Sequence, residues 1–240
     1  MPALTLTMGN LRQKPAARSR RPAIWARIHA HVGALRAFAL AATLGACGGA
    51  PPTPAPVVPA RAAAVPEVEA FARGWGERTL WRVPLRVALP DARAWHASTS
   101  GTFTLLDHAA TRSRLALRVT LAPRLVRPAE CEAEARLARP SLPQVEPSSV
   151  VEQRTIAAPP DFDVRLVVGV EPNADGVRGY ALAVGAGTSR CYVAAFETES
   201  AGPKAAEHVA DRLAVVVSGM FETMSVPNAD RRVVPPTGVK

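Results

Sequence analysis

Between residues 67 and 226 apolar side chains recur mostly at every second position, which is the period of β-strands. The alternating stretches predict strands at residues 81–89, 103–105, 115–121, 162–170, 177–184 and 190–199. Short polar turns at 173–176 and 185–189 separate the last three, which we therefore expect to form an antiparallel meander. Pro84 places the first strand at an edge or a bulge, because proline donates no backbone hydrogen bond.

Two stretches have the helical period instead. Pro128 suits the first position of a helix over 129–138, whose glutamates lie near its N-terminus and whose arginines lie near its C-terminus. A longer helix is predicted over 203–224, with an apolar stripe formed by Val209, Leu213, Val216, Met220 and Met224. The predicted order is three strands, a helix, four strands and a terminal helix. The fold class is therefore α+β: an antiparallel sheet of about six to seven strands covered by a long C-terminal helix and a shorter helix.

This order loosely resembles that of the Mog1/PsbP-like domains, which end in a long helix packed on an antiparallel sheet. Leu89 and Pro90, followed by Trp95, are similar to the proline and tryptophan near the first strand of that family. The resemblance implies an accessory or binding module without catalysis, and the family includes lipid-anchored bacterial proteins.

An export signal is predicted before this domain. Residues 37–44 form a short apolar run preceded by scattered arginines and followed by small residues. The boundary reads Leu44-Gly45-Ala46-Cys47 and resembles the lipobox of bacterial lipoproteins. That resemblance implies signal cleavage between Ala46 and Cys47 and acylation of the Cys47 thiol. Two or more acyl chains hold a protein durably at a bilayer, so the lipid bilayer is the first expected partner.

The chain divides into four segments. Residues 1–46 are the predicted signal, 47–66 the lipid anchor and a Pro/Ala-rich tether, 67–226 the globular domain and 227–240 a disordered tail. Export signals usually have about 15–30 residues, so a start at Met8 or Val32 would account for the extra length.

Two other readings of the N-terminal segment compete with the lipobox. Residues 19–24 read as a twin-arginine signal, although Ala23 replaces the hydrophobic residue expected there and the apolar run lies far downstream. A buried helix over 37–44 with an ordinary thiol at Cys47 is disfavoured, because the glycine and proline pairs that follow end a helix at once.

The charge of the chain changes meaning once this segment is set aside. The formal net charge is +9, a value typical of proteins that bind nucleic acid. Seven basic residues and no acidic ones lie in residues 1–46, which leaves about +2 for the rest. We therefore expect no nucleic acid as a partner. The expected location of this chain is the periplasmic side of the cell envelope, and its expected partner is another envelope protein. Gly48 rather than aspartate after Cys47 favours the outer membrane under the sorting rule of that family.

Cys131 and Cys191 remain as an even pair once Cys47 is acylated. In an exported protein we expect them to form a disulfide that joins the first helix to the last strand. The alternative is a pair of buried thiols.

No catalytic, cofactor-binding or metal-ligating residue is predicted, and no cofactor. His96, His108 and His208 lack metal-ligand spacing, and His208 is expected on the solvent side of the terminal helix. Residues 171–176 resemble the first half of a calcium loop but lack its twelfth-position carboxylate, so they are expected to form a turn.

The favoured function is a membrane-anchored envelope lipoprotein acting as a non-catalytic binding or accessory module. The alternatives are a small envelope hydrolase and a small-ligand carrier. A hydrolase requires a pocket where His96 or His108 meets a carboxylate and a nucleophile, and a carrier requires an apolar cavity of ~300 Å³ or more. A binding module requires an exposed apolar patch around residues such as Trp75, Trp81 or Trp95.

Overall fold

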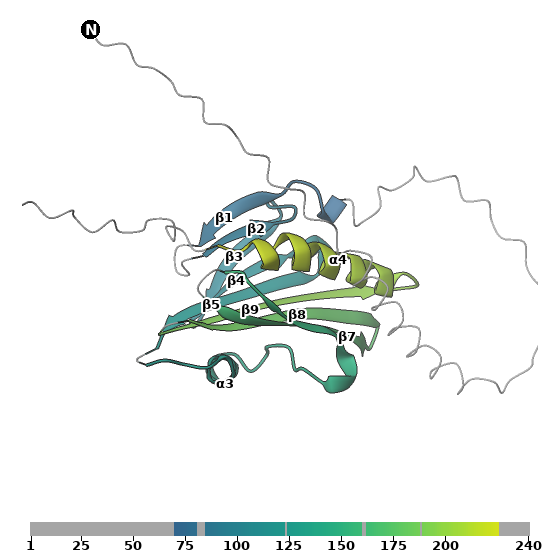
Figure 1. The fold of residues 1–240 in the computed structure, drawn as a ribbon. Coiled ribbons are helices and arrows are strands. Elements are labelled where there is room, and N and C mark those ends of the chain that lie inside the picture. The colour runs from purple at the N-terminus through teal and green to yellow at the C-terminus, as the bar shows by residue number, and fades with distance from the viewer. Residues whose placement is uncertain (1–69, 81–84, 123, 160–161, 188, 226–240) are drawn as a thin grey trace, which may run out of the picture.

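A seven-stranded antiparallel sheet lies at the centre of the structure (Figure 1). The computed structural model describes residues 70–80, 85–122, 124–159, 162–187 and 189–225. In spatial order the strands are β3 (Trp95–Ser100), β4 (Phe103–His108), β5 (Ser113–Leu121), β9 (Arg190–Ala201), β8 (Gly176–Gly187), β7 (Asp163–Asn173) and β6 (Val150–Ile156). All neighbouring strands are antiparallel. β3 and β6, the first and last in this order, are the two edges of the sheet.

Two helices cover opposite faces of this sheet (Figure 1). The helix α4 (Ala205–Gly219) lies on one face and α3 (Pro128–Ala138) on the other. A separate hairpin of β1 (Gly76–Leu80) and β2 (Leu85–Leu89) lies on the same side as α4. Three short 3-10 helices complete the described structure: η1 (Ala109–Thr111), η2 (Pro147–Ser149) and η3 (Phe221–Thr223). None of the helices among the described residues is long and apolar enough to cross a membrane.

The predicted α+β class is confirmed, and so is the meander formed by β7, β8 and β9. Two residues separate β7 from β8 and two separate β8 from β9, at the turns that the sequence indicated. Four strands were predicted after the first helix and three of them were given ranges; the remaining one is β6, the first strand after α3. Pro128 occupies the first turn of α3, and the Glu130 side chain accepts a hydrogen bond from the backbone N–H of Arg127.

The strand prediction for the N-terminal part of the domain is wrong in two respects. The strand expected over 81–89 begins only at Leu85, as β2, and pairs with β1, which was not predicted. Pro84 and Trp81 lie outside the described residues. β3 was also missed, because five of its six residues are exposed and polar or small, so they carry no apolar alternation.

The terminal helix is shorter than the predicted 203–224. α4 ends at Gly219, and the chain continues as η3. A Cβ atom at Gly219 would lie 2.3 Å from the Trp75 ring, so the helix end packs directly against this tryptophan. The apolar stripe nevertheless continues through Met220 and Met224, which remain buried.

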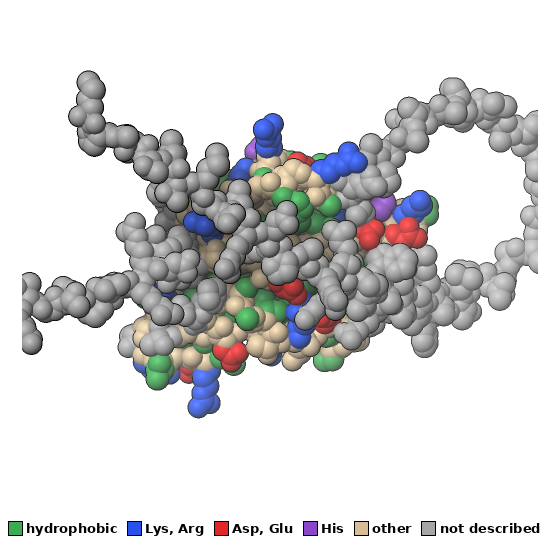
Figure 2. Space-filling view, turned by 45° about the horizontal axis from the view of Figure 1, so that its top comes forward, with side chains coloured by type: hydrophobic (Ala, Val, Ile, Leu, Met, Phe, Trp, Pro, Cys, Tyr) green, Lys and Arg blue, Asp and Glu red, His purple; other side chains and the backbone are tan. Residues whose placement is uncertain are grey.

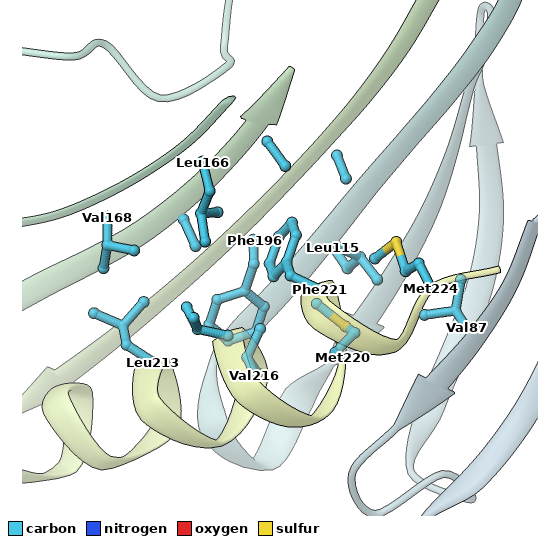
Figure 3. Close-up of a cluster of buried hydrophobic side chains, with 14 of the residues drawn as sticks. Val87, Leu115, Leu166, Val168, Phe196, Leu213, Val216, Met220, Phe221 and Met224 are labelled. Carbon is cyan, nitrogen blue, oxygen red and sulfur yellow. The ribbon is translucent and has the colours of Figure 1, made fainter. Parts of the chain in front are cut away.

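The main core lies between α4 and the sheet (Figure 3). Leu213 and Val216 of α4, and Met220 directly after it, point toward Leu166, Val168 and Phe196 of the strands, and all six side chains are buried. The hairpin extends this core, since Val87 lies beside Met224 in the same cluster. A second, smaller core lies between α3 and the other sheet face.

The closest approach of α4 to the sheet occurs at Gly179 in β8. A Cβ atom there would lie 2.4 Å from Cγ1 of Val209 and 2.8 Å from Cδ1 of Leu213. Neither distance is possible for a real Cβ, so the helix rests on a strand position that has no side chain.

Gly179→Ala is therefore expected to lower the free energy of unfolding by ~1–3 kcal/mol, because α4 must move away from β8. Urea unfolding followed by circular dichroism measures the change. Thr99→Ala on exposed β3 is the matched control and should leave the midpoint unchanged. Equal midpoints for Gly179→Ala and the unsubstituted protein would show that the helix does not rest on this position.

Candidate functional site

A groove of about 380 Å³ lies between the hairpin β1–β2 and the strands β3 and β4. It is lined by residues 78–80 of β1, by residues 97–99 of β3 and by Thr104 and Leu106 of β4. Ala97 lies opposite Leu106 in the β3–β4 ladder, so both side chains belong to the sheet face on which α4 packs. The groove is thus the seam between the hairpin layer and the sheet layer.

One positive charge faces this seam. The half-buried Arg78 lines the groove, and its Nη2 donates a hydrogen bond to the Ala92 carbonyl at 2.7 Å. Among the ion pairs of the described residues, none joins a carboxylate to Arg78. The carbonyl holds the guanidinium in place without neutralising it.

Two further grooves in the described part of the chain lie along β6 and β7, one of about 860 Å³ beside residues 125–126 and one of about 410 Å³ beside the start of α3. The arginines that line them are already paired within the domain. Arg165 bonds Glu132 at 2.6 Å, and Arg154 bonds Glu152 at 2.7 Å and also pairs with Glu222. The seam beside β3 therefore differs from them in offering an unneutralised cation.

Figure 2 shows acidic and basic side chains interspersed on the face that it presents, with neither sign gathered in one patch.

A chain of polar side chains, buried except at the partly exposed Asp91, lies close to the N-terminal end of the described domain. Nε2 of His108 is 3.1 Å from the Asp91 carboxylate, and its Nδ1 is 2.8 Å from the Thr111 hydroxyl. The hydroxyls of Thr111, Ser113 and Thr198 continue the chain at 2.8 and 2.9 Å. The carboxylate favours the tautomer in which Nε2–H donates to Asp91, while Nδ1 accepts from Thr111.

Arg212 of α4 ends this chain. Its Nη1 donates to the Thr111 carbonyl, to Thr198 Oγ1 and to the Glu199 carbonyl at 2.9–3.0 Å. Burial lowers the pKa of Arg212 to about 10, which leaves the guanidinium charged at neutral pH. The cation thus supplies three charge-assisted hydrogen bonds inside the fold, to two carbonyls and one hydroxyl.

Carboxylate, imidazole and hydroxyl in this order are the parts of a nucleophilic catalytic site. A nucleophile must also reach a substrate, however, and Thr111 and Ser113 are only 5% and 3% exposed. The His108 ring is packed between Phe71 and Trp95, at centroid distances of 5.4 and 5.1 Å. In the described structure this chain joins the domain entry, the turn before β5 and α4, and its chemistry is that of a structural connection.

Thr111→Val removes the hydroxyl at the centre of the chain and leaves His108 Nδ1 and Ser113 Oγ without that partner. We expect the free energy of unfolding to fall by ~1–3 kcal/mol, the cost of a buried polar group left unsatisfied. Ser218→Ala is the control, because that hydroxyl bonds only the Ala214 carbonyl of its own helix turn. The two variants are compared by thermal and urea unfolding, and equal losses would contradict a special role for the chain.

The structure joins Cys131 of α3 and Cys191 of β9 in a disulfide, with their Cα atoms 5.3 Å apart. Both residues are buried in the smaller core. The bond fastens α3 to the sheet face opposite α4 and closes a loop with a sequence separation of 60.

Reduction is expected to lower the free energy of unfolding by roughly 4 kcal/mol, the chain-entropy value for a loop of this length. The measurement is urea unfolding with and without dithiothreitol. A Cys131→Ala/Cys191→Ala double variant is the control, since its stability should not respond to the reductant. A midpoint of the unsubstituted protein that is insensitive to reductant would show that the two thiols are not joined.

The structure places the other sequence-predicted residues as follows. Ala46 and Cys47 lie outside the described residues, so cleavage and acylation stay predictions. Trp95 is a core residue whose Nε1 donates to the Pro90 carbonyl, whereas Trp75 is 41% exposed. Within the described residues no group of three or more His, Cys, Asp or Glu side chains is placed to hold a metal ion.

Two of the histidines and the calcium-like segment also have definite places. His96 is exposed on β3. His208 is half-buried rather than fully on the solvent side of α4, with Nδ1 3.3 Å from the Ser200 hydroxyl. Residues 171–176 form the β7–β8 hairpin turn and the strand ends around it.

Sequence reasoning missed the features that define both sites. No role in a site was predicted for Asp91, Thr111 or Arg212, because none belongs to a motif and Thr111 and Arg212 are 101 residues apart. Arg78 was missed together with β1. One local signal was available in the sequence, since Asp91 directly follows the Leu89-Pro90 pair and aspartate is common in turns. In the structure Asp91 has a positive φ of 44°, a conformation that aspartate adopts more readily than most residues.

Comparison with known proteins adds little. No family model matches the sequence, and no curated protein matches it. One similar solved structure is a protein from Bacteroides thetaiotaomicron VPI-5482, with 6% sequence identity and a TM-score of 0.38. The match covers 64% of this chain and 49% of that one, so this chain spans about half the length of that protein.

Proposed function

We propose that this protein is a lipid-anchored protein of the cell envelope, and that its domain is a non-catalytic binding module. The observation that carries the binding role is the groove between β1 and β3, which combines apolar walls, hydroxyl groups and the charge of Arg78. Apolar walls with a few polar groups that fix orientation are typical of ligand-binding sites.

The anchoring part of the proposal rests on the sequence before the domain. The lipobox-like residues 44–47 and the tether that follows support attachment through Cys47 on the periplasmic side, at the outer membrane. The Cys131–Cys191 disulfide supports an oxidising compartment. A relation to the Mog1/PsbP-like domains, whose members are mostly accessory modules, stays a prediction.

The hydrolase alternative is the weakest of the three functions. Asp91, His108 and Thr111 are arranged in the right order, but the hydroxyls are buried and none of these residues lines a described groove.

A small-ligand carrier is the second candidate, and one observation favours it. The groove volume of about 380 Å³ is large enough for a compact amphipathic ligand, since ligand sites begin at ~300 Å³.

Lipidation is tested by growing cells with a labelled fatty acid. The unsubstituted protein should carry the label and fractionate with membranes, whereas Cys47→Ala should carry none, because the acylated thiol is absent. Gly48→Asp is the matched control: it should keep the label and move the protein to the inner membrane. Equal label in the unsubstituted protein and in Cys47→Ala would exclude the anchor.

The binding role is tested separately by cross-linking in intact cells followed by purification in detergent. A protein or ligand that is recovered with the unsubstituted chain at a fixed stoichiometry supports the module. Recovery of the chain alone under every cross-linker would contradict it.

A further inference from the structure

The two edges of the seven-stranded sheet differ in how they are protected. β6 carries charged Glu152 and Arg154, which form an ion pair, and its register with β7 shifts between Val150 and Glu152. Charges and bulges of this kind prevent an edge from pairing with another chain. β6 is therefore a closed edge.

β3 has none of these devices. Residues 96–100 read His-Ala-Ser-Thr-Ser, with no lysine, acidic residue or proline, and all five are exposed. The register with β4 runs without a bulge from Trp95 to Ser100. Among the described residues β3 pairs with β4 alone. An unprotected edge in an otherwise protected sheet favours pairing with a further strand.

The hairpin register shows which backbone groups this edge presents. A two-residue turn joins Ser100 to Phe103, and the residues that flank such a turn form a hydrogen-bonded pair. Pairs alternate from there along the ladder, so Ala97 and Thr99 are at non-hydrogen-bonded positions. Their N–H and C=O groups point away from β4, and the same two residues line the groove.

The opposite wall of the groove selects the chemistry of the added strand. β1 is the outer strand of its hairpin, since β2 pairs with β1 on one side and with Ser225 on the other. It contributes the apolar Leu80 and the unneutralised Arg78 to the lining. A strand seated along β3 would therefore place apolar side chains against Leu80 and Leu106, and a carboxylate beside Arg78.

We propose that the groove binds an extended acidic peptide segment of a partner protein, which adds to β3 as an eighth strand and pairs a carboxylate with Arg78. The inference rests on the proposed binding role and names its partner class. Residues 97–99 and 78–80 run along the groove for roughly 10 Å at strand spacing, so the contact covers about three residues of the partner.

The decisive variant is Ala97→Pro, which removes one outward N–H and leaves the β3–β4 hydrogen bonds in place. Ala97→Ser keeps that N–H and the small side chain, and is the matched control. Arg78→Gln removes the charge from the other wall. Thr99→Glu places a carboxylate in the groove, and Ser100→Glu places the same charge on the opposite face of β3. Arg78→Gln and the pair Thr99→Glu and Ser100→Glu keep the proposal testable should Ala97→Pro fail to fold.

The probe is a displayed library of random twelve-residue peptides, selected on the full chain purified in detergent. Enriched peptides should contain an acidic residue within an alternating apolar pattern. We expect Ala97→Pro and Arg78→Gln each to weaken their binding about tenfold or more, the loss of one backbone or charge-assisted hydrogen bond in a bound strand. Thr99→Glu should weaken it as well, because its carboxylate repels that of the peptide. Ala97→Ser and Ser100→Glu should bind as the unsubstituted chain does.

Several results would overturn the proposal. The first is the absence of enriched peptides, and the second is equal binding of the peptides to Ala97→Pro and Ala97→Ser. The third is that the groove binds a fluorescent fatty acid and binds no peptide. A dimer in sedimentation that dissociates in Ala97→Pro would mean that β3 pairs with a second copy of this chain. If cross-linking recovers a partner equally well with Ala97→Pro and with the unsubstituted chain, the binding module stands and its assignment to β3 fails.

Discussion

A seven-stranded sheet is wider than one helix can cover, and the arrangement of the whole domain follows from this mismatch. Seven strands at their usual spacing extend about 29 Å, whereas a helix with its side chains is ~10 Å across. α4 lies over β8 and β9, where Gly179 lets it approach closely, and it leaves the β3–β4 end of that face to the hairpin β1–β2. Covering one face with two separate pieces creates a seam between them. The groove is that seam, and its position beside an edge strand is a consequence of which strands the helix covers.

The buried polar chain holds the two covering pieces in place. Asp91 lies just after the hairpin, His108 and Thr111 lie where β4 passes into η1, and Arg212 lies on α4. The connection therefore runs from the hairpin layer through the sheet to the helix. Hydrophobic packing alone would allow these pieces to slide over the sheet, whereas hydrogen bonds with fixed directions define one arrangement. The carboxylate, histidine and hydroxyl connect these three parts of the fold. Their likeness to a catalytic chain is therefore not sufficient evidence for catalysis.

The parts that were predictable from the sequence are those that local patterns determine. β7, β8 and β9 have long apolar alternation and clear turn residues, and α3 has its proline and its charge gradient, so all four were found. β3 carries exposed small and polar residues on both faces, so alternation could not reveal it, and β1 carries its polar residues at the groove. The His108 and Arg212 contacts join segments far apart along the chain, and no local pattern records them. The groove was therefore hidden for the same reason that β3 is an open edge: the residues that β3 contributes to it are small or polar and carry no apolar alternation.

The point at which the chain enters the described domain has a further consequence when force is considered. Phe71, one residue after the first described position, packs edge-on against the His108 ring, and the backbone of Arg73 and Gly74 bonds that of Asp91 and Ala92. A pull applied from the residues before Ala70 reaches these contacts before it reaches any strand of the large sheet. The contacts would be loaded one after another, as in peeling, rather than together as in shear. Tension on the N-terminal side would thus act first on these contacts and on the hairpin that follows them in the chain.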